Sequence, residues 1–80
     1  MALLCHNQMT KLNKTRISVH QTVRATYSTF KDSSGRKFFQ IDTYGSEDRE
    51  IPNKISQSLQ FDEETALFLL DVIKNELELK

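Results

Sequence analysis

The sequence predicts an α+β fold: a small, curved antiparallel β-sheet of three to four strands, followed by one C-terminal α-helix packed on one face. In three stretches between residues 16 and 61, polar and apolar residues alternate with period two, as is typical of half-buried strands. From Asp62 the period becomes helical, with no Gly or Pro to interrupt it. The length of 80 residues allows one domain, expected over 15–80 after a flexible basic arm over 1–14.

The first predicted strand begins at Arg16 and is unusually long. Gln21 is the one polar residue in its apolar register. Because the run is about twice the usual strand length, we expect a bend or a bulge near Gln21. The apolar register contains Ile17, Val19, Val23, Ala25 and Tyr27.

A polar turn over Lys31–Gly35 separates this strand from the next. Its glycine can adopt a positive φ, so the second strand, Arg36–Tyr44, should pair antiparallel with the first. In that strand Phe39 and Ile41 would face the core.

A third strand is predicted over Lys54–Phe61, after a charged loop over Gly45–Pro52. Ile55 and Leu59 would face inward, while Gln57 breaks the apolar parity.

The helix is predicted to begin after Asp62, whose carboxylate can accept from the unpaired amides of the first turn, and to run to Lys80. Its apolar side chains form two stripes at 100° per residue. The first stripe should cover the sheet and consists of Ala66, Leu69, Leu70, Ile73 and Leu77.

The second stripe, Phe68, Val72 and Leu79, lies nearly opposite the first. A helix on one small sheet buries only one stripe, so the second needs another cover. We expect a homodimer packed through these three residues, because so small a core needs further support. The alternative is that the arm, or Leu3 and Leu4, folds over the second stripe.

The net charge of zero hides a strong asymmetry. Residues 1–40 contain seven Lys and Arg against one acid, a balance of +6, and residues 41–80 contain four against ten, a balance of −6. This favours contact between the first half and a polyanion. A solvated basic sheet followed by a solvated acidic helix explains the split equally well.

The strand face that points away from the predicted core combines rings, cations and hydroxyls. Rings stack on unpaired bases and cations bind phosphates, which favours single-stranded nucleic acid. Reading a duplex usually needs a basic helix, whereas this helix is acidic. The expected phosphate-binding residues are Arg24, Arg36, Lys37 and Lys54, with Lys11, Lys14 and Arg16 adding reach from the arm, and the expected base-stacking residues are Phe38 and Tyr44.

The string FFQIDTY and the later segment IPNKISQSLQFDEETALFLLDVI resemble the single-strand-binding domain of the transcriptional-coactivator family called positive cofactor four. Pro52 and Lys54 match its Pro-x-Lys loop, residues 59–61 match its third strand, and Asp62 matches its helix cap. The resemblance covers about residues 24–78. It implies a curved antiparallel sheet, a C-terminal helix and a dimer that grips unpaired strands.

Asp42 departs from this family, which has Arg at that position. The carboxylate lies on the outward face and would repel phosphate unless Arg24 or Arg36 pairs with it. An ordinary solvated sheet face, with Phe38 at a dimer seam, is the alternative interpretation.

We expect no enzyme activity, no cofactor and no bound metal. The pair Cys5-His6 with His20 fits no zinc-ligand spacing. The chain has only two glycines, so it lacks a Gly-rich phosphate loop. Nucleases hold Mg²⁺ with acids on a rigid strand edge. The crowded acids of this chain lie in a loop instead; they are Glu47, Asp48 and Glu50.

These observations predict a cytoplasmic homodimeric module that binds single-stranded DNA or RNA as an accessory factor in transcription or replication. The single cysteine favours a reducing compartment, and no apolar run approaches the roughly 20 residues that span a membrane. The alternative is a non-enzymatic protein–protein adaptor or regulator of a bacterial or mobile-element system, which the neutral overall charge favours.

Overall fold

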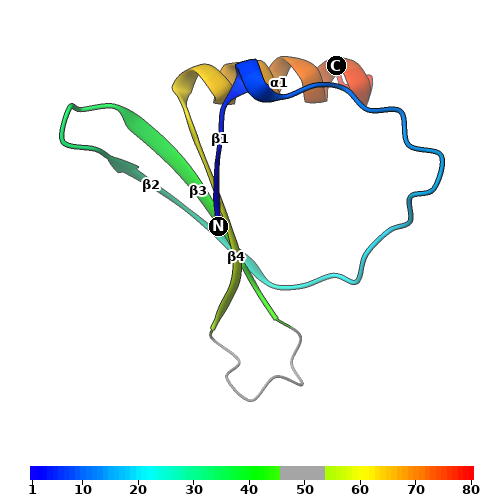
Figure 1. Ribbon diagram of the computed structural model, residues 1–80, viewed down its shortest axis with the longest axis horizontal. Coiled ribbons are helices and arrows are strands. Elements are labelled where there is room, and N and C mark those ends of the chain that lie inside the picture. The colour runs from blue at the N-terminus through cyan, green and yellow to red at the C-terminus, as the bar shows by residue number, and fades with distance from the viewer. Residues whose placement is uncertain (46–53) are drawn as a thin grey trace.

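The computed structural model describes residues 1–45 and 54–80 and confirms the α+β fold. Four strands form one open sheet in the order β1-β4-β3-β2, and a single α-helix follows the last strand (Figure 1). The β2–β3 and β3–β4 pairs are antiparallel, and the β1–β4 pair is parallel. The elements are β1 (Ala2–Leu4), a 3₁₀ turn η1 (His6–Gln8), β2 (Ala25–Lys31), β3 (Lys37–Tyr44), β4 (Ile55–Asp62) and α1 (Glu63–Glu76).

The turn between β2 and β3 forms as predicted. Gly35 has a φ of 88°, and its N–H donates to the Asp32 carbonyl over 3.1 Å. The Asp32 carboxylate accepts from the backbone N–H groups of Ser34 and Arg36 at 2.9 and 3.0 Å. These bonds satisfy the backbone N–H groups of Ser34, Gly35 and Arg36 within the turn.

The N-terminal residues are more ordered than predicted. Ala2–Leu4, expected to belong to the flexible arm, pair with residues 59–61 of β4. The next residues form η1, where the His6 N–H donates to the Thr65 hydroxyl of α1 over 3.0 Å. The local sequence has no strand periodicity, so this strand depends on the exposed edge of β4 rather than on propensity.

The prediction of a long first strand is wrong for residues 16–24, because β2 begins only at Ala25. The Tyr44 N–H donates to the Arg24 carbonyl over 2.9 Å, and β3 ends at this point. Within the described residues, no strand continues beside residues 16–23, which leave the sheet in a wide curve (Figure 1). Alternation alone does not make a strand, since a strand needs a hydrogen-bonding neighbour.

Helix α1 begins as predicted and ends four residues earlier than Lys80. The Thr65 N–H donates to the Asp62 carboxylate over 3.0 Å, and Glu63 and Glu64 lie in the first turn. The helix ends at Glu76, and the last residues form a turn with Glu78 at a φ of 53°.

The first apolar stripe was predicted to cover the sheet, but it does not do so along its length. Thr65 is fully buried and Leu69 is half-buried, but Leu70 is 66% exposed and Leu77 is equally open. No residue separates β4 from α1, so the helix starts at the end of the sheet and crosses that end instead of lying along the strands (Figure 1). Only its first turns can therefore pack against the sheet.

The two sheet faces have the predicted parity but not the predicted burial. The Phe38 face (Phe38, Gln40, Asp42 and Tyr44 of β3, with their neighbours) was expected to be open, yet Phe38 is 9% exposed. The Phe39 face (Phe39, Ile41 and Thr43, with their neighbours) was expected to be the core, yet Tyr27 on this face is 77% exposed. The cause is that α1 covers only one end of the Phe39 face.

No α-helix among the described residues is both long enough and apolar enough to cross a membrane.

Acid should destabilise the fold through Asp62 and Asp32. The hydrogen bond from Thr65, with the Arg36 guanidinium, lowers the pKa of Asp62 below 3.8, and bonds from Ser34 and Arg36 lower the pKa of Asp32. A depressed folded pKa contributes stability above the unfolded value, which is lost as the pH falls through the folded value. Stability should therefore hold above about pH 4 and decline below it, as urea unfolding from about pH 6 to about pH 2 would measure.

The matched variants separate titration from capping. Asp62→Asn keeps a side-chain acceptor for the helix N-terminus but cannot titrate, so its stability should depend less on pH in the acid range. Asp71→Asn, on the exposed part of α1, should leave the wild-type profile unchanged. An Asp62→Asn profile as steep as that of the wild type would assign the acid sensitivity to other groups.

Candidate nucleic-acid interface

A polar network occupies the middle of the Phe38 face. The Gln60 amide donates to the Gln40 carbonyl oxygen over 2.8 Å, and the Gln40 amide donates to both Asp42 oxygens at 2.8 and 3.0 Å. The Ser58 hydroxyl also donates to Asp42. Asp42 is 8% exposed, so its charge is held within the sheet by neighbouring β3 and β4 side chains.

This network alters the expectation for Asp42. The sequence predicts repulsion of phosphate unless Arg24 or Arg36 pairs with this carboxylate. Arg36 pairs instead with Asp62, through Nη2 at 2.9 Å. Amide and hydroxyl donors satisfy the Asp42 oxygens, and the side chain is not displayed on the surface.

Phe38, which was predicted to stack on bases, is buried, with 9% of its surface exposed. The Phe30 ring stacks on it with centroids 5.3 Å apart and planes 13° from parallel. The Arg36 guanidinium lies over the same ring at 5.1 Å from the centroid. The sequence pattern gave the correct face for Phe38 but not the side chains that cover it.

The hairpin end of the sheet carries a pair of lysines. Lys31 and Lys37 are directly opposite each other in the β2–β3 ladder, and both are exposed. Like charges in a cross-strand pair repel, which favours a nearby anion. Sequence analysis selected Lys37 but missed Lys31; the β2–β3 register, fixed by the turn, is the signal that places them together.

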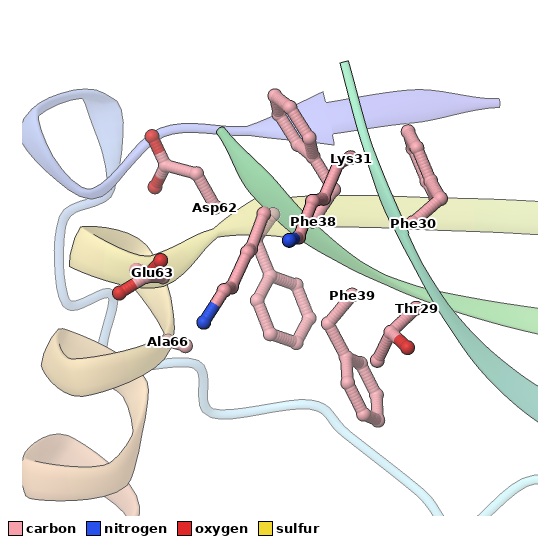
Figure 2. Close-up of a pocket in the computed structure, with 10 residues that line it drawn as sticks. Thr29, Phe30, Lys31, Phe38, Phe39, Asp62, Glu63 and Ala66 are labelled. Carbon is pink, nitrogen blue, oxygen red and sulfur yellow. The ribbon is translucent and has the colours of Figure 1, made fainter. Parts of the chain in front are cut away.

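Both lysines line a hollow of about 510 Å³ between the hairpin, the end of β4 and the first turn of α1. Figure 2 shows Phe38 and Phe39 projecting from opposite sides of β3 and Ala66 facing the hollow from α1. The walls are largely apolar, and Glu63 lies on the helix side. This hollow therefore suits an apolar group better than a phosphate.

At the opposite end of the sheet two other predicted residues are in contact, and a third lies at the same end. The Arg24 guanidinium lies over the Tyr44 ring at 4.1 Å from its centroid. The Tyr44 hydroxyl and the Thr26 hydroxyl are 3.1 Å apart and share a hydrogen bond. The exposed Lys54 precedes Ile55, which pairs with Tyr44. We name Arg24, Tyr44 and Lys54 the Tyr44 cluster.

The arm cations are not gathered at either end of the sheet. Lys11 forms an ion pair with Glu76 of α1, with 2.8 Å between Nζ and Oε1. Lys14 and Arg16 are exposed in the curved segment before β2. The nine predicted binding residues are thus divided among two sheet ends and the arm.

The arm covers part of the second helix stripe. Phe68 and Val72 line a hollow of about 310 Å³ together with residues 9–11, and both are half-buried. The His6 ring lies 5.9 Å from the Phe68 ring, while Leu79 is exposed. Within one chain, two of the three residues expected at a dimer interface therefore line a hollow together with the arm, as the alternative interpretation holds.

Metal ligands do not gather among residues 1–45 and 54–80, where no three His, Cys, Asp or Glu side chains come together. His6 lies 3.5 Å from Glu64, and Cys5 is a free exposed thiol. The predicted acidic loop, with Glu47, Asp48 and Glu50, lies outside the described residues.

Replacing Phe38 by Ala should lower the free energy of unfolding by about 3 kcal/mol, because the ring fills the best-buried apolar position of the described chain. Phe30→Ala, at a more exposed position, should cost less. Urea unfolding of both variants measures the difference. A Phe38→Ala protein that stays as stable as the wild type but binds nucleic acid more weakly would restore the predicted stacking role.

No family model, no curated protein and no solved structure matches this chain.

Proposed function

We propose that this chain is a small non-enzymatic module that binds single-stranded nucleic acid as a homodimer, through the Tyr44 cluster. The observation that carries the proposal is the planar Arg24 guanidinium held over the Tyr44 ring, at the same end of the sheet as the exposed Lys54. Guanidinium planes and aromatic rings both stack on unpaired bases, and Lys and Arg bind phosphates.

The rest of the sheet supports this location, because its acids are engaged within the fold. Asp32 accepts from the turn, Asp42 from Gln40 and Ser58, and Asp62 from Thr65 and Arg36. The cations at the sheet ends are exposed. Arg24 and Lys54 are both exposed at this end of the sheet.

The homodimer is supported by the area that one chain leaves exposed. A folded monomer of this size exposes about 5,000 Å², whereas this chain exposes 7438 Å². The excess of about 2,400 Å² is comparable with what each subunit buries in a large obligate interface. Its radius of gyration, 15.0 Å, likewise exceeds the roughly 12 Å of a compact domain of 80 residues.

We place this activity in the cytoplasm, as an accessory to transcription or replication. The exposed free thiol of Cys5 suits a reducing compartment, where such a group is not oxidised. A single-strand binder of this size has its role wherever duplex DNA is opened or RNA is unpaired.

A second candidate is a protein–protein adaptor, which the Phe39 face favours. Tyr27, Phe39 and Phe61 form a row of rings, with neighbouring centroids 5.7 and 5.4 Å apart. The outer ring is largely exposed, as are Leu70 and Leu77 of α1. Exposed apolar surface of this kind is typical of protein interaction sites.

The double variant Arg24→Ala, Lys54→Ala should weaken the binding of a labelled single-stranded oligonucleotide and reduce its salt dependence. Each lost phosphate contact reduces the slope of log affinity against log salt by about 0.7 for single strands, so the double variant should lose about 1.4. Fluorescence anisotropy over a salt series, with a duplex of the same sequence for comparison, measures both.

Two controls localise the effect. Arg24→Lys keeps the charge but loses the plane, so affinity should fall while the salt slope stays near that of the wild type. Lys74→Ala, in the last turn of α1, should change neither. If micromolar wild-type protein binds no single strand in a salt-sensitive way, the nucleic-acid function is excluded and the adaptor is favoured.

A further inference from the structure

The outer edge of β2 offers seven residues for pairing with another strand. β2 is the last strand in the order β1-β4-β3-β2, so its outer edge has no neighbour within the described sheet. All seven of its residues, from Ala25 to Lys31, are exposed. Natural sheets usually protect such an edge with prolines, bulges or several charges, whereas β2 has one lysine and no proline.

The hydrogen bonds at the two ends of the β2–β3 ladder show which backbone groups face outward. Tyr44 N–H donates to the Arg24 carbonyl, and Asp32 N–H donates to the Arg36 carbonyl. Bonded and non-bonded pairs alternate in an antiparallel ladder, so the even-numbered residues of β2 face β3. The backbone groups that face outward belong to Ala25, Tyr27, Thr29 and Lys31.

The segment just before β2 has the sequence of a strand but no strand neighbour. Residues 17–23 alternate apolar and polar side chains, except that Gln21 occupies an apolar position, and they contain neither Gly nor Pro. Ile17 is 77% exposed and Val19 is 100% exposed. Residues 17–23 thus resemble a strand but pair with no other strand in the described sheet. The neighbouring strand β2 has an outer edge beside which no strand lies in that sheet.

We propose that residues 17–23 of a second copy pair antiparallel with the outer edge of β2, in a reciprocal exchange centred on Arg24. This inference rests on the homodimer of the proposed function and names its surface. Under a two-fold axis at Arg24, both copies make the same contact, as a closed dimer requires.

The register of this exchange puts the apolar side chains of residues 17–23 on the Phe39 face and the polar ones on the Phe38 face, with Gln21 as the exception. Odd residues pair with odd residues: Val23 with Ala25, Gln21 with Tyr27, and Val19 with Thr29 of the other copy. Since directly paired residues share a face, the two valines lie on the apolar Phe39 face. On the Phe38 face His20 meets Ser28 and Thr22 meets Thr26, which are polar pairs.

The exchange also brings the two Arg24 side chains together at the axis. This places the two Tyr44 clusters next to each other and joins two half-sites into one.

Disulfide cross-linking tests the register directly. In a Cys5→Ser background, His20→Cys with Ser28→Cys places the two thiols at a non-bonded pair, where the Cα separation of about 4.5 Å permits a disulfide. Mild oxidation should give a covalent dimer on a non-reducing gel. The matched control, His20→Cys with Thr26→Cys, is out of register by two residues and should stay largely monomeric on the gel.

A single Ser28→Cys variant distinguishes the main competing contact. If two β2 strands paired directly around Ser28, this variant alone would cross-link, and the exchange would be wrong. We expect no cross-link from it.

Proline substitution gives a second test that leaves the single chain intact, because residues 17–23 have no regular structure there. Gln21→Pro removes an N–H that bonds to the other copy and should weaken dimerisation by at least about tenfold. Thr22→Pro removes an N–H that points away and should have a smaller effect. Sedimentation or light scattering over a dilution series measures both.

The outcomes separate this inference from the proposed function. A dimer that gives no in-register cross-link overturns the exchange and leaves the homodimer standing. If the wild-type protein is a monomer at micromolar concentration, both the exchange and the homodimer are wrong. Anisotropy tests the salt-sensitive binding of single strands independently.

Discussion

The contacts of Asp62 hold the three parts of this fold together. Its carboxylate accepts from the Thr65 N–H at the start of α1 and pairs with Arg36 at the hairpin end. Its backbone ends β4 and lies opposite Phe38 in the ladder. The helix start, the hairpin and the buried ring of the Phe38 face therefore depend on one side chain and its neighbours.

Small size is the constraint behind the rest of the structure. Among the described residues, Phe38 is the one large apolar side chain that reaches burial, and the other well-buried positions are the polar Asp42, Ser58 and Thr65. Hydrogen bonds and stacked rings along the sheet thus take the place of a conventional core. A chain built in this way gains more from association than a larger domain does, because its apolar surface is already exposed.

The fold class, the hairpin and the helix cap could be predicted because each follows from local residues: alternation, the turn at Gly35 and Asp62 at the helix start. The strand boundaries could not, since Ala25 begins β2 only because β3 ends at Tyr44. The pairing of Ala2–Leu4 with β4 depends on contacts more than fifty residues apart in the chain, which no local pattern contains.

In the candidate site, too, local residues predict some features and distant contacts determine the others. Alternation placed Phe38 and Tyr44 on one face, but their cover comes from Arg36 and Arg24, whose positions depend on the whole ladder. A pattern of residue types gives the face of a strand. It does not give the rotamers of the long side chains that lie across it.

Because β4 passes directly into α1, Asp62 belongs both to the β3–β4 ladder and to the start of the helix. A slip of one residue in the β3–β4 ladder would turn Asp62 to the other face and away from Arg36. A misaligned sheet would thus lose the ion pair that joins the hairpin end to the start of the helix, which gives the chain a preference for one alignment.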